Sequence, residues 1–562
     1  MIEGIGAILL RKTNLTEGDL QAALGIQEKS GERLGEVLVK QKKIKELDLL
    51  QALSDQFRMD VVPVLPTGIS TDFTKIIPIA FLKRNILVPI ITEEERYVAM
   101  YDPSLFQAYD DICQLLEMPG CPCQLCSHGE IIRAINAAYD TSHDSAEDVM
   151  LDIDEDDPDV LFSKIEEVGD LLDDTSHSPV IRLVNLMLSQ AVRNNVSDIH
   201  IEPYQNLLKI RQRLDGILYD MFAPPKHVQS ALTSRIKLMA KMNIAEKRLP
   251  QDGRIEIKVG NKDIDIRVST LPTAFGERVV MRLLDKSTVR MSLSDLGMSE
   301  ERLKVFSEII RSPNGIILVT GPTGSGKTTT LYAALTAINN VDINIITVED
   351  PIEYRIPGIG QVQVNPKIDL TFASGLRSIV RQDPDVILIG EIRDFETAEI
   401  AIQSALTGHL VFSTVHTNDA ASTITRLRDM GVESFLIASS INAILAQRLV
   451  RIICPACREA YVPEPVELER IGLTPEVLGD RKIFRGRGCD DCHQTGYQGR
   501  CGIHEFLVVD DAVKSMILKT SDSSELKRYV RGQGMKTLVQ DGAEKVLAGI
   551  TTIAEVYRVA QG

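Results

Sequence analysis

The clearest chemical signal is the segment Gly-Pro-Thr-Gly-Ser-Gly-Lys-Thr at residues 321–328. Its fixed positions are those of a phosphate-binding loop, and the apolar run Ile316–Val319 precedes it as a buried strand should. This context disfavours a chance glycine-rich turn. Backbone N–H groups of such a loop converge on phosphate oxygens, and the helix that follows adds partial positive charge.

We therefore expect a bound nucleotide at this loop. Lys327 is expected to reach the β- and γ-phosphates of ATP, and Thr328 to hold Mg²⁺. The expected contacts are Gly321, Pro322, Thr323, Gly324, Ser325, Gly326, Lys327, Thr328 and Thr329.

Three later segments read as strands that end in polar side chains. They end in Glu349 and Glu353, in Glu391, and in His416. We expect Glu391 to hold the Mg²⁺ shell through water, and Glu353, with Glu349 as second choice, to orient or deprotonate the attacking water. His416 is expected to sense the γ-phosphate. The alternatives are a turn cap for Glu353 and a structural core histidine for His416.

Residues 286–453 alternate helix and strand patterns, which predicts an α/β fold with a parallel sheet. Ligands bind at the carboxyl ends of such strands, so all the polar clusters should face one crevice. Residues 178–194 form an amphipathic pattern and are followed by strand-like segments at 198–202, 207–213, 254–258, 264–270 and 277–284. A second α/β domain is expected there.

Two Cys-x-x-Cys pairs predict a closed, structural Cys₄ zinc site. Its ligands would be Cys454, Cys457, Cys489 and Cys492, and helical segments are expected after them. A redox pair is the alternative, but a reducing compartment disfavours disulfides. A second group, Cys113, Cys121, Cys123 and Cys126, lacks this pairing and is interpreted as buried or incidental thiols, with a metal site as the alternative.

The N-terminal region contains a repeat. An offset of 29 residues aligns Gly6–Leu10 with Gly35–Val39 and Ala23-Leu24 with Ala52-Leu53, and each unit reads as two short helices. Residues 60–140 look mixed α/β. Residues 141–175 hold fourteen acidic residues and one lysine, most of the net charge of −17. Such a block favours a flexible tether.

The expected domains are 1–140 (a docking domain with the tandem repeat at 4–56), 141–176 (an acidic linker), 177–286 (the second α/β domain), and 287–562 (the nucleotide-binding domain with a zinc insertion at 454–501). No apolar run spans a bilayer and no signal peptide is evident, so a cytoplasmic protein is expected. Outside the acidic block the charge is close to neutral, which argues against a nucleic-acid partner.

Three of these segments together resemble motifs of the secretion-superfamily traffic ATPases. Glu349–Glu353 resembles the Asp box, Gly390–Asp394 the Walker B motif, and the strand His409–His416 the His box. The type II secretion ATPase and the type IV pilus extension ATPase are the most similar members. The resemblance implies a RecA-like core, a PAS-like second domain, and a homohexamer associated peripherally with the inner membrane. It also implies an inner-membrane platform protein and a cytoplasmic recruiting domain as partners.

The resemblance extends to arginines and to the repeat. Arg254 and Arg267 are similar to arginines that the family delivers to the γ-phosphate across a domain or subunit interface, with surface salt bridging as the alternative. Arg33 and the residues after it resemble a tandem motif that binds cyclic di-GMP. Gly4, Thr13 and Lys42 depart from that motif, and a helical docking module is the alternative.

The leading hypothesis is a Mg²⁺-dependent ATPase motor for type II secretion or pilus assembly. A pilus retraction motor fits less well, because that subfamily lacks the long N-terminal region and the cysteine pairs. Two further hypotheses are a DNA-transfer ATPase and a nucleotide-gated scaffold without turnover. Two segments look more like those of pilus proteins, namely Thr417–Ala420 and Ala438–Arg448. One segment, Arg426–Gly431, looks more like that of secretion proteins. The sequence therefore does not choose between the two pathways.

Overall fold

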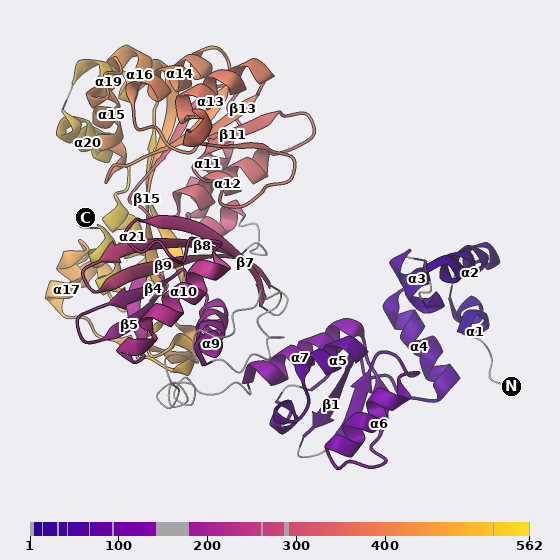
Figure 1. Ribbon diagram of the computed structural model, residues 1–562. Helices are drawn as coiled ribbons and strands as arrows, with labels where there is room; N and C mark the ends of the chain where they lie inside the picture. Colours follow the sequence, from indigo (N-terminus) through magenta and orange to yellow (C-terminus); the bar gives the residue numbers. More distant parts are fainter. Residues whose placement is uncertain are drawn as a thin grey trace. The chain divides into compact units, whose positions relative to one another are not determined.

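The computed structural model describes residues 5–13, 15–30, 33–41, 43–66, 68–92, 95–141, 179–259, 262–285, 292–520 and 522–560. The expected acidic linker, apart from its first residue, lies outside the described residues, as do Gly4 and Lys42. The chain divides into two compact units, Met1–Leu214 with Leu218–Asp285, and Asp215–Ile217 with Lys286–Gly562 (Figure 1).

The N-terminal repeat forms four helices, as its sequence predicts. They are α1 (Ile5–Lys12), α2 (Glu17–Ser30), α3 (Leu34–Lys40) and α4 (Glu46–Phe57). Leu9 of α1 and its repeat mate Leu38 of α3 are both fully buried, and so are Ala23 and Ala52. The two copies therefore bury equivalent positions in one small core.

Residues 59–141 form the expected mixed α/β module. Its elements are α5 (Ile79–Asn85), β1 (Leu87–Ile91), β2 (Arg96–Met100), α6 (Phe106–Leu115), β3 (Cys123–Leu125) and α7 (His128–Thr141). The strands form a three-stranded sheet in the order β1-β2-β3. Its apolar residues share one core with residues of α5 and α7.

Residues 179–285 fold into a six-stranded sheet that the helices α9 (Pro179–Arg193) and α10 (Gln229–Met239) help to bury. The strands are β4 (Asp198–Pro203), β5 (Leu208–Leu214), β6 (Ile217–Phe222), β7 (Gln251–Val259), β8 (Lys262–Thr273) and β9 (Gly276–Asp285). Their order is β6-β5-β4-β9-β8-β7. The sequence predicted five of them. It missed β6, which is only partly buried and has no clear apolar alternation.

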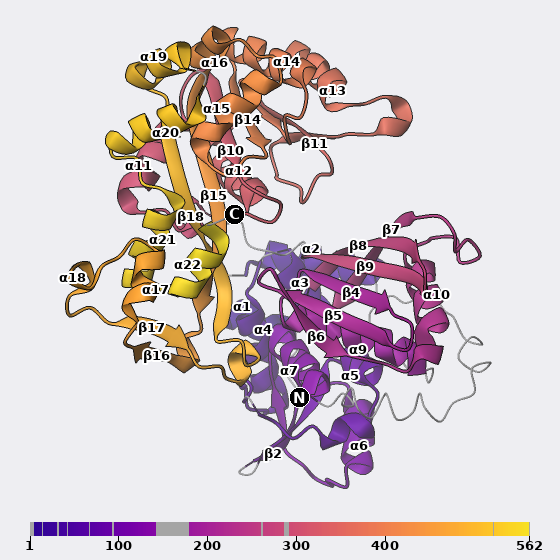
Figure 2. The ribbon, with the colours of Figure 1, turned by 90° about the vertical axis from the view of Figure 1, so that its left-hand side faces the viewer.

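The second unit is built on a seven-stranded sheet in the order β12-β11-β13-β14-β10-β15-β18 (Figure 2). The strands are β10 (Gly315–Thr320), β11 (Ile345–Glu349), β12 (Gly360–Gln363), β13 (Val386–Ile389), β14 (Leu410–Val415), β15 (Ile441–Ile453) and β18 (Tyr497–Val508). The first six are parallel, as the sequence predicts, and β18 pairs antiparallel with β15. The parallel strands bring their carboxyl ends to one edge of the sheet.

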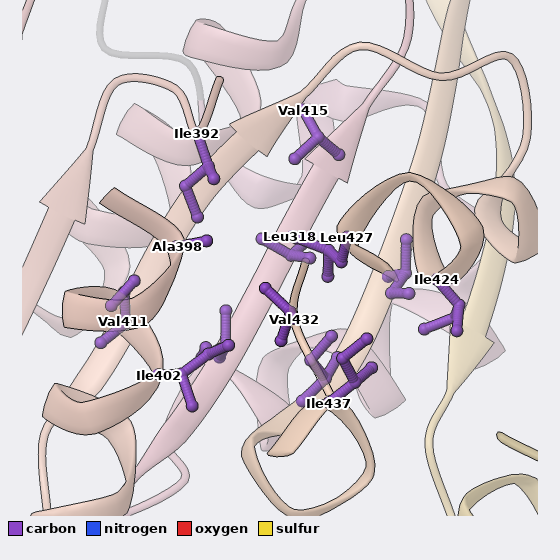
Figure 3. Packing of buried hydrophobic residues seen from close by; sticks show 14 of the residues in the cluster. Leu318, Ile392, Ala398, Ile402, Val411, Val415, Ile424, Leu427, Val432 and Ile437 are labelled. Carbon is purple, nitrogen blue, oxygen red and sulfur yellow. The ribbon is translucent and has the colours of Figure 1, made fainter. Parts of the chain in front are cut away.

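Helices bury both faces of this sheet. They are α11 (Glu300–Ile309), α12 (Lys327–Ile338), α13 (Phe372–Ile379), α14 (Phe395–Leu406), α15 (Ala420–Asp429), α16 (Ser434–Ser440), α19 (Asp511–Lys519) and α20 (Ser523–Gly532). Ile316 and Leu318 pack against α14, α15 and α16 on one face (Figure 3). Ile317 and Val319 pack against α11 and α12 on the other. This alternation follows from the two-residue period of a strand buried on both sides.

The cysteine segment lies between β15 and β18. It contains β16 (Arg458–Tyr461), α17 (Pro465–Arg470), α18 (Pro475–Leu478) and β17 (Ile483–Gly486), with β16 and β17 paired antiparallel. The chain ends in α21 (Leu538–Leu547) and α22 (Ile553–Ala560) after α19 and α20. The helical segments expected after the cysteines are thus present, and β18, which the sequence analysis did not predict, precedes them and returns to the main sheet. Among the helices in the described ranges, none has the length and apolar character needed to cross a bilayer.

Candidate active site and candidate metal centre

The loop between β10 and α12 is shaped by three glycines with positive φ. Gly321, Gly324 and Gly326 have φ of +145°, +79° and +86°, a region that residues with a Cβ adopt only with strain. A Cβ at Gly321 would lie 2.4 Å from the carbonyl oxygen of Gln447 in β15. The loop therefore packs directly on the neighbouring strand, and glycine is required at this contact.

The same loop offers polar groups that fit a phosphate. A Cβ at Gly324 would meet nothing within 4 Å, so the loop is open at that residue. The hydroxyl of Ser325 is buried and makes no hydrogen bond to any described residue. Lys327 Nζ donates to the carbonyl oxygens of Gly321 at 2.8 Å and Pro322 at 3.0 Å, which holds the ammonium against the loop. Burial lowers the pKa of Lys327 to about 8.

Lys327, Glu391 and His416 come together at the carboxyl edge of the sheet. Glu391 follows β13, His416 follows β14, and β14 lies between β13 and β10. His416 Nε2 lies 3.4 Å from a carboxylate oxygen of Glu391, and Arg393 Nε lies 2.6 Å from the same oxygen. Burial and the nearby charge of Lys327 lower the pKa of His416. The site thus places a cation, a carboxylate and a neutral imidazole beside the glycine loop.

Glu349 lies in a more enclosed position at the end of β11. It is buried and accepts hydrogen bonds from the hydroxyl of Tyr332, from Thr347 Oγ1 at 2.5 Å and from Gln361 Nε2 at 3.1 Å. Both of its oxygens are therefore engaged within the protein. The backbone of Glu353 hydrogen-bonds the hydroxyl of Tyr332, and burial together with Glu349 raises the pKa of that tyrosine.

Sequence reasoning missed two residues of β15 that contact this region. Gln447 is buried, and its amide oxygen accepts a 2.6 Å hydrogen bond from Thr330 in α12. Arg448 donates to Asn418 Oδ1 at 3.0 Å, and its charge lowers the pKa of Lys327 further. The adjacent polar residues Gln447 and Arg448, between apolar residues of a largely buried strand, were the available signal.

Arg254 and Arg267 lie on neighbouring strands and face each other directly in the β7–β8 ladder. Arg254 forms an ion pair with Asp265 of β8. Asp265 is buried, whereas the side chain of Arg254 is 59% exposed. The two arginines therefore belong to one charged patch of the six-stranded sheet.

Cys454, Cys457, Cys489 and Cys492 bring their sulfur atoms to within 4.8 Å of one another. Three of the sulfur pairs lie 3.7, 3.8 and 3.9 Å apart. Tetrahedral zinc with Zn–S bonds of ~2.3 Å needs S–S edges of ~3.8 Å, so four thiols at this spacing fit the metal. Although burial opposes it, N–H donation from Cys489 and Gly496 lowers the pKa of Cys492 to about 7.

The N-terminal cysteines have a different environment. Burial raises the pKa of Cys113 and Cys121, that of Cys123 to about 12 and that of Cys126 to about 11. Within the described residues their sulfurs do not converge as a group of three or more. These thiols stay protonated at neutral pH. Cys113 and Cys126 are buried, whereas Cys121 and Cys123 are partly buried.

Comparison with known proteins now identifies the class to which this fold and site belong. A family model described as "Type II/IV secretion system protein" matches residues 173–558, and one described as "MshEN domain" matches residues 57–145. The chain belongs to the type II/IV secretion system protein family.

Individual relatives agree with this assignment. The chain is 49% identical over 488 residues to type II secretion system protein E of Pseudomonas aeruginosa, covering 86% of this chain and 96% of the relative. It is 43% identical over 555 residues to the type IV pilus assembly ATPase PilB of Myxococcus xanthus, covering 98% of both. The crystal structure of the Yersinia pseudotuberculosis ATPase DotB shares its fold, with a TM-score of 0.52 and 21% identity, over 71% of this chain and 96% of that one.

Proposed function

We propose that this protein hydrolyses ATP to ADP and phosphate and uses the energy to assemble a type II secretion pseudopilus or a type IV pilus. One observation carries the proposal: Lys327, Glu391 and His416 gather beside a glycine loop in a chain of the secretion family. The names of its relatives support a role in assembly, since they include a type II secretion system protein and a type IV pilus assembly ATPase.

The residue roles follow from their surroundings. Residues 321–329 bind the triphosphate, and Lys327 neutralises it with a charge that is already close to the loop. Thr328 and Glu391 would hold Mg²⁺, which supplies additional positive charge to the phosphates when it is bound. We assign the water-orienting role to Glu353, because both oxygens of Glu349 are engaged by neighbouring donors. His416 links the site to the end of β14.

Phosphate release tests this proposal. The unaltered chain should release phosphate from ATP with Mg²⁺, and Lys327→Ala should abolish the release. Glu391→Gln should lower it by at least a hundredfold while nucleotide still binds. The exposed residues Lys367 and Glu308 in the same unit provide matched controls. Lys367→Ala and Glu308→Gln should keep full activity. A chain that binds ATP without turnover would instead be a nucleotide-gated scaffold.

We further propose a homohexamer that acts at the cytoplasmic face of the inner membrane through partner proteins. The family assignment and the lack of a membrane-spanning helix among the described residues support this. Arg254 and Arg267 are proposed to act on a nucleotide held by another domain or subunit. Arg267→Ala should then lower turnover without weakening nucleotide binding, and unchanged turnover would leave these arginines as surface ion pairs.

The two pathways remain candidates for different reasons. The higher sequence identity, 49%, is to a type II secretion system protein, which favours secretion. The match to the type IV pilus assembly ATPase covers 98% of both chains, which favours pilus assembly. Expression of the chain in a host that lacks only its secretion ATPase, and in one that lacks only its pilus extension ATPase, would separate them. Restored secretion without surface pili supports the first pathway, and restored pili support the second.

The repeat in residues 4–56 is proposed as a docking module for a recruiting domain, with cyclic di-GMP as its second candidate ligand. Arg33 is the residue on which the cyclic di-GMP proposal rests. The Arg33 side chain forms an ion pair with Asp102. Calorimetry with cyclic di-GMP decides between them: binding that Arg33→Ala removes supports the nucleotide, and no heat at millimolar ligand excludes it.

Zinc is proposed at the four-cysteine cluster, where it would fix the segment between β15 and β18. Four protein ligands leave no open coordination position, so its role there would be structural. Metal content of the purified chain should be about one zinc ion per chain.

A further inference from the structure

The turn that follows His416, residues Thr417–Ala420, is tied to four different elements. Two backbone amides of the turn act as donors: Thr417 N donates to Thr320 Oγ1 of β10 at 2.8 Å, and Ala420 N donates to Glu505 Oε1 of β18 at 2.9 Å. Two side chains act as acceptors. Asn418 Oδ1 accepts from Arg448 of β15 at 3.0 Å, and Asp419 Oδ2 accepts from Lys527 Nζ of α20 at 2.9 Å. Each residue of the turn thus has its own anchor.

Three of the four anchors, Thr320, Arg448 and Glu505, lie in low-dielectric surroundings. Glu505 is 2% exposed and Arg448 is 8% exposed. A hydrogen bond inside a protein is electrostatically stronger than one in water, and breaking it leaves a buried partner unsatisfied. Asp419 also caps α15, because its second oxygen accepts from Ser422 N at 2.9 Å. The turn and the start of α15 are therefore coupled to β18 and α20.

The other end of the turn reaches the phosphate site. His416 lies beside Glu391 and within the electrostatic influence of Lys327. Thr320, which holds Thr417, immediately precedes the first glycine of the phosphate loop. Figure 2 shows α20 next to α15, with which it shares a core that contains Leu526, Ile424 and Leu427. The His416 turn and α20 are thus connected by one ion pair, Lys527–Asp419, and by one packed core.

We propose that the Thr417–Ala420 turn carries changes at the phosphate site to the C-terminal helix α20, with Arg448 and Lys527 as its positioning residues. This inference rests on the proposed ATPase function and deepens it. Lys527–Asp419 is the adjustable link, because Lys527 is 31% exposed while the Arg448 and Glu505 anchors are nearly inaccessible to water. A partly solvated ion pair re-forms at small cost, which suits a link that moves in each catalytic cycle.

Lys527→Met tests the link, because it keeps the apolar stem and removes the charge. Lys527→Arg restores the charge. Lys514→Met is the matched control, since Lys514 pairs with Asp511 at 3.4 Å on the adjacent helix α19, away from the turn. Hydrogen exchange of the α20 amides is measured on the full chain, with and without a non-hydrolysable ATP analogue and Mg²⁺. Nucleotide affinity, phosphate release, Tm and oligomer mass are measured on the same samples.

The unaltered chain, Lys527→Arg and Lys514→Met should all show a nucleotide-dependent change in α20 exchange. Lys527→Met should lose that change and lose about tenfold in kcat, with KM, Tm and oligomer mass unchanged, because the link affects geometry after binding.

Bound nucleotide without any α20 response in the unaltered chain would overturn the link and leave the ATPase proposal intact. A normal response in Lys527→Met, or a lower Tm together with weaker nucleotide binding, would also overturn it. Failure of the unaltered chain to bind nucleotide would overturn the proposed function and the link with it.

Discussion

The low pKa of Lys327 predicts an unusual pH dependence of nucleotide binding. Burial holds this pKa at about 8 in the free protein. The ammonium form binds phosphate, and bound phosphates favour that form. Binding must therefore take up a proton above pH 8. Affinity should be full below this value and should fall as the pH rises through it.

The expected magnitude follows from the fraction of charged lysine. With a pKa of about 8, roughly nine tenths of Lys327 is protonated at pH 7 and roughly one tenth at pH 9. The Kd for ATP should therefore rise about tenfold over this range, equivalent to ~1.4 kcal/mol. Phosphate groups are already ionised above pH 7, with a second pKa of ~6, so the nucleotide contributes little to the change. The lowered pKa of His416 keeps that side chain neutral throughout.

Calorimetric titration of a non-hydrolysable ATP analogue at pH 7, 8 and 9 measures this effect. Lys327→Arg is the control, because a guanidinium stays charged at all three values. That variant should bind with a pH-independent Kd, even if its affinity is lower. A flat profile for the unaltered chain, or an equal slope for both proteins, would refute the role assigned to the buried lysine.

Three other perturbations have defined outcomes. Gly321→Ala should lower Tm by at least ~4 °C more than Gly324→Ala, because only the first methyl meets a backbone carbonyl, and strain of ~2 kcal/mol or more shifts Tm by this much; equal Tm values would contradict the contact. Cys492→Ser should reduce bound zinc from about one per chain, whereas Cys501→Ser, in β18 and outside the four-cysteine cluster, should retain it; identical metal contents would count against the cluster. Tyr332→Phe should cost ~1–3 kcal/mol of unfolding free energy in denaturant titrations, since it leaves the buried carboxylate of β11 short of a donor; an unchanged midpoint would disprove that network.

Much of the fold was predictable because its signals are local. The phosphate loop follows a buried strand, and the repeat places Leu9 and Leu38 in equivalent core positions. The strand β6 pairs locally, with β5 only two residues before it, but its partly buried residues show no apolar alternation, so the sequence pattern did not reveal it. The return of β18 to the main sheet was not predictable, since it depends on pairing with β15 across the whole cysteine segment. The four-cysteine cluster was predictable from spacing, but its position between β15 and β18 was not.

The site shows the same division. Lys327, Glu391 and His416 were expected near one another because parallel strands align their carboxyl ends. Gln447 and Arg448 were missed, because their contacts with Thr330 and Asn418 exist only once β15 lies beside β10. The enclosed position of Glu349 was likewise hidden, since its donors come from three segments.

A structure of the chain with a non-hydrolysable ATP analogue and Mg²⁺ tests the central claim most directly. The account predicts phosphate oxygens on the backbone amides of residues 324–328 and on Lys327 Nζ, the metal on Thr328, and Glu391 and His416 facing the γ-phosphate. A nucleotide held elsewhere, or a γ-phosphate beyond the reach of Lys327, Glu391 and His416, would contradict it.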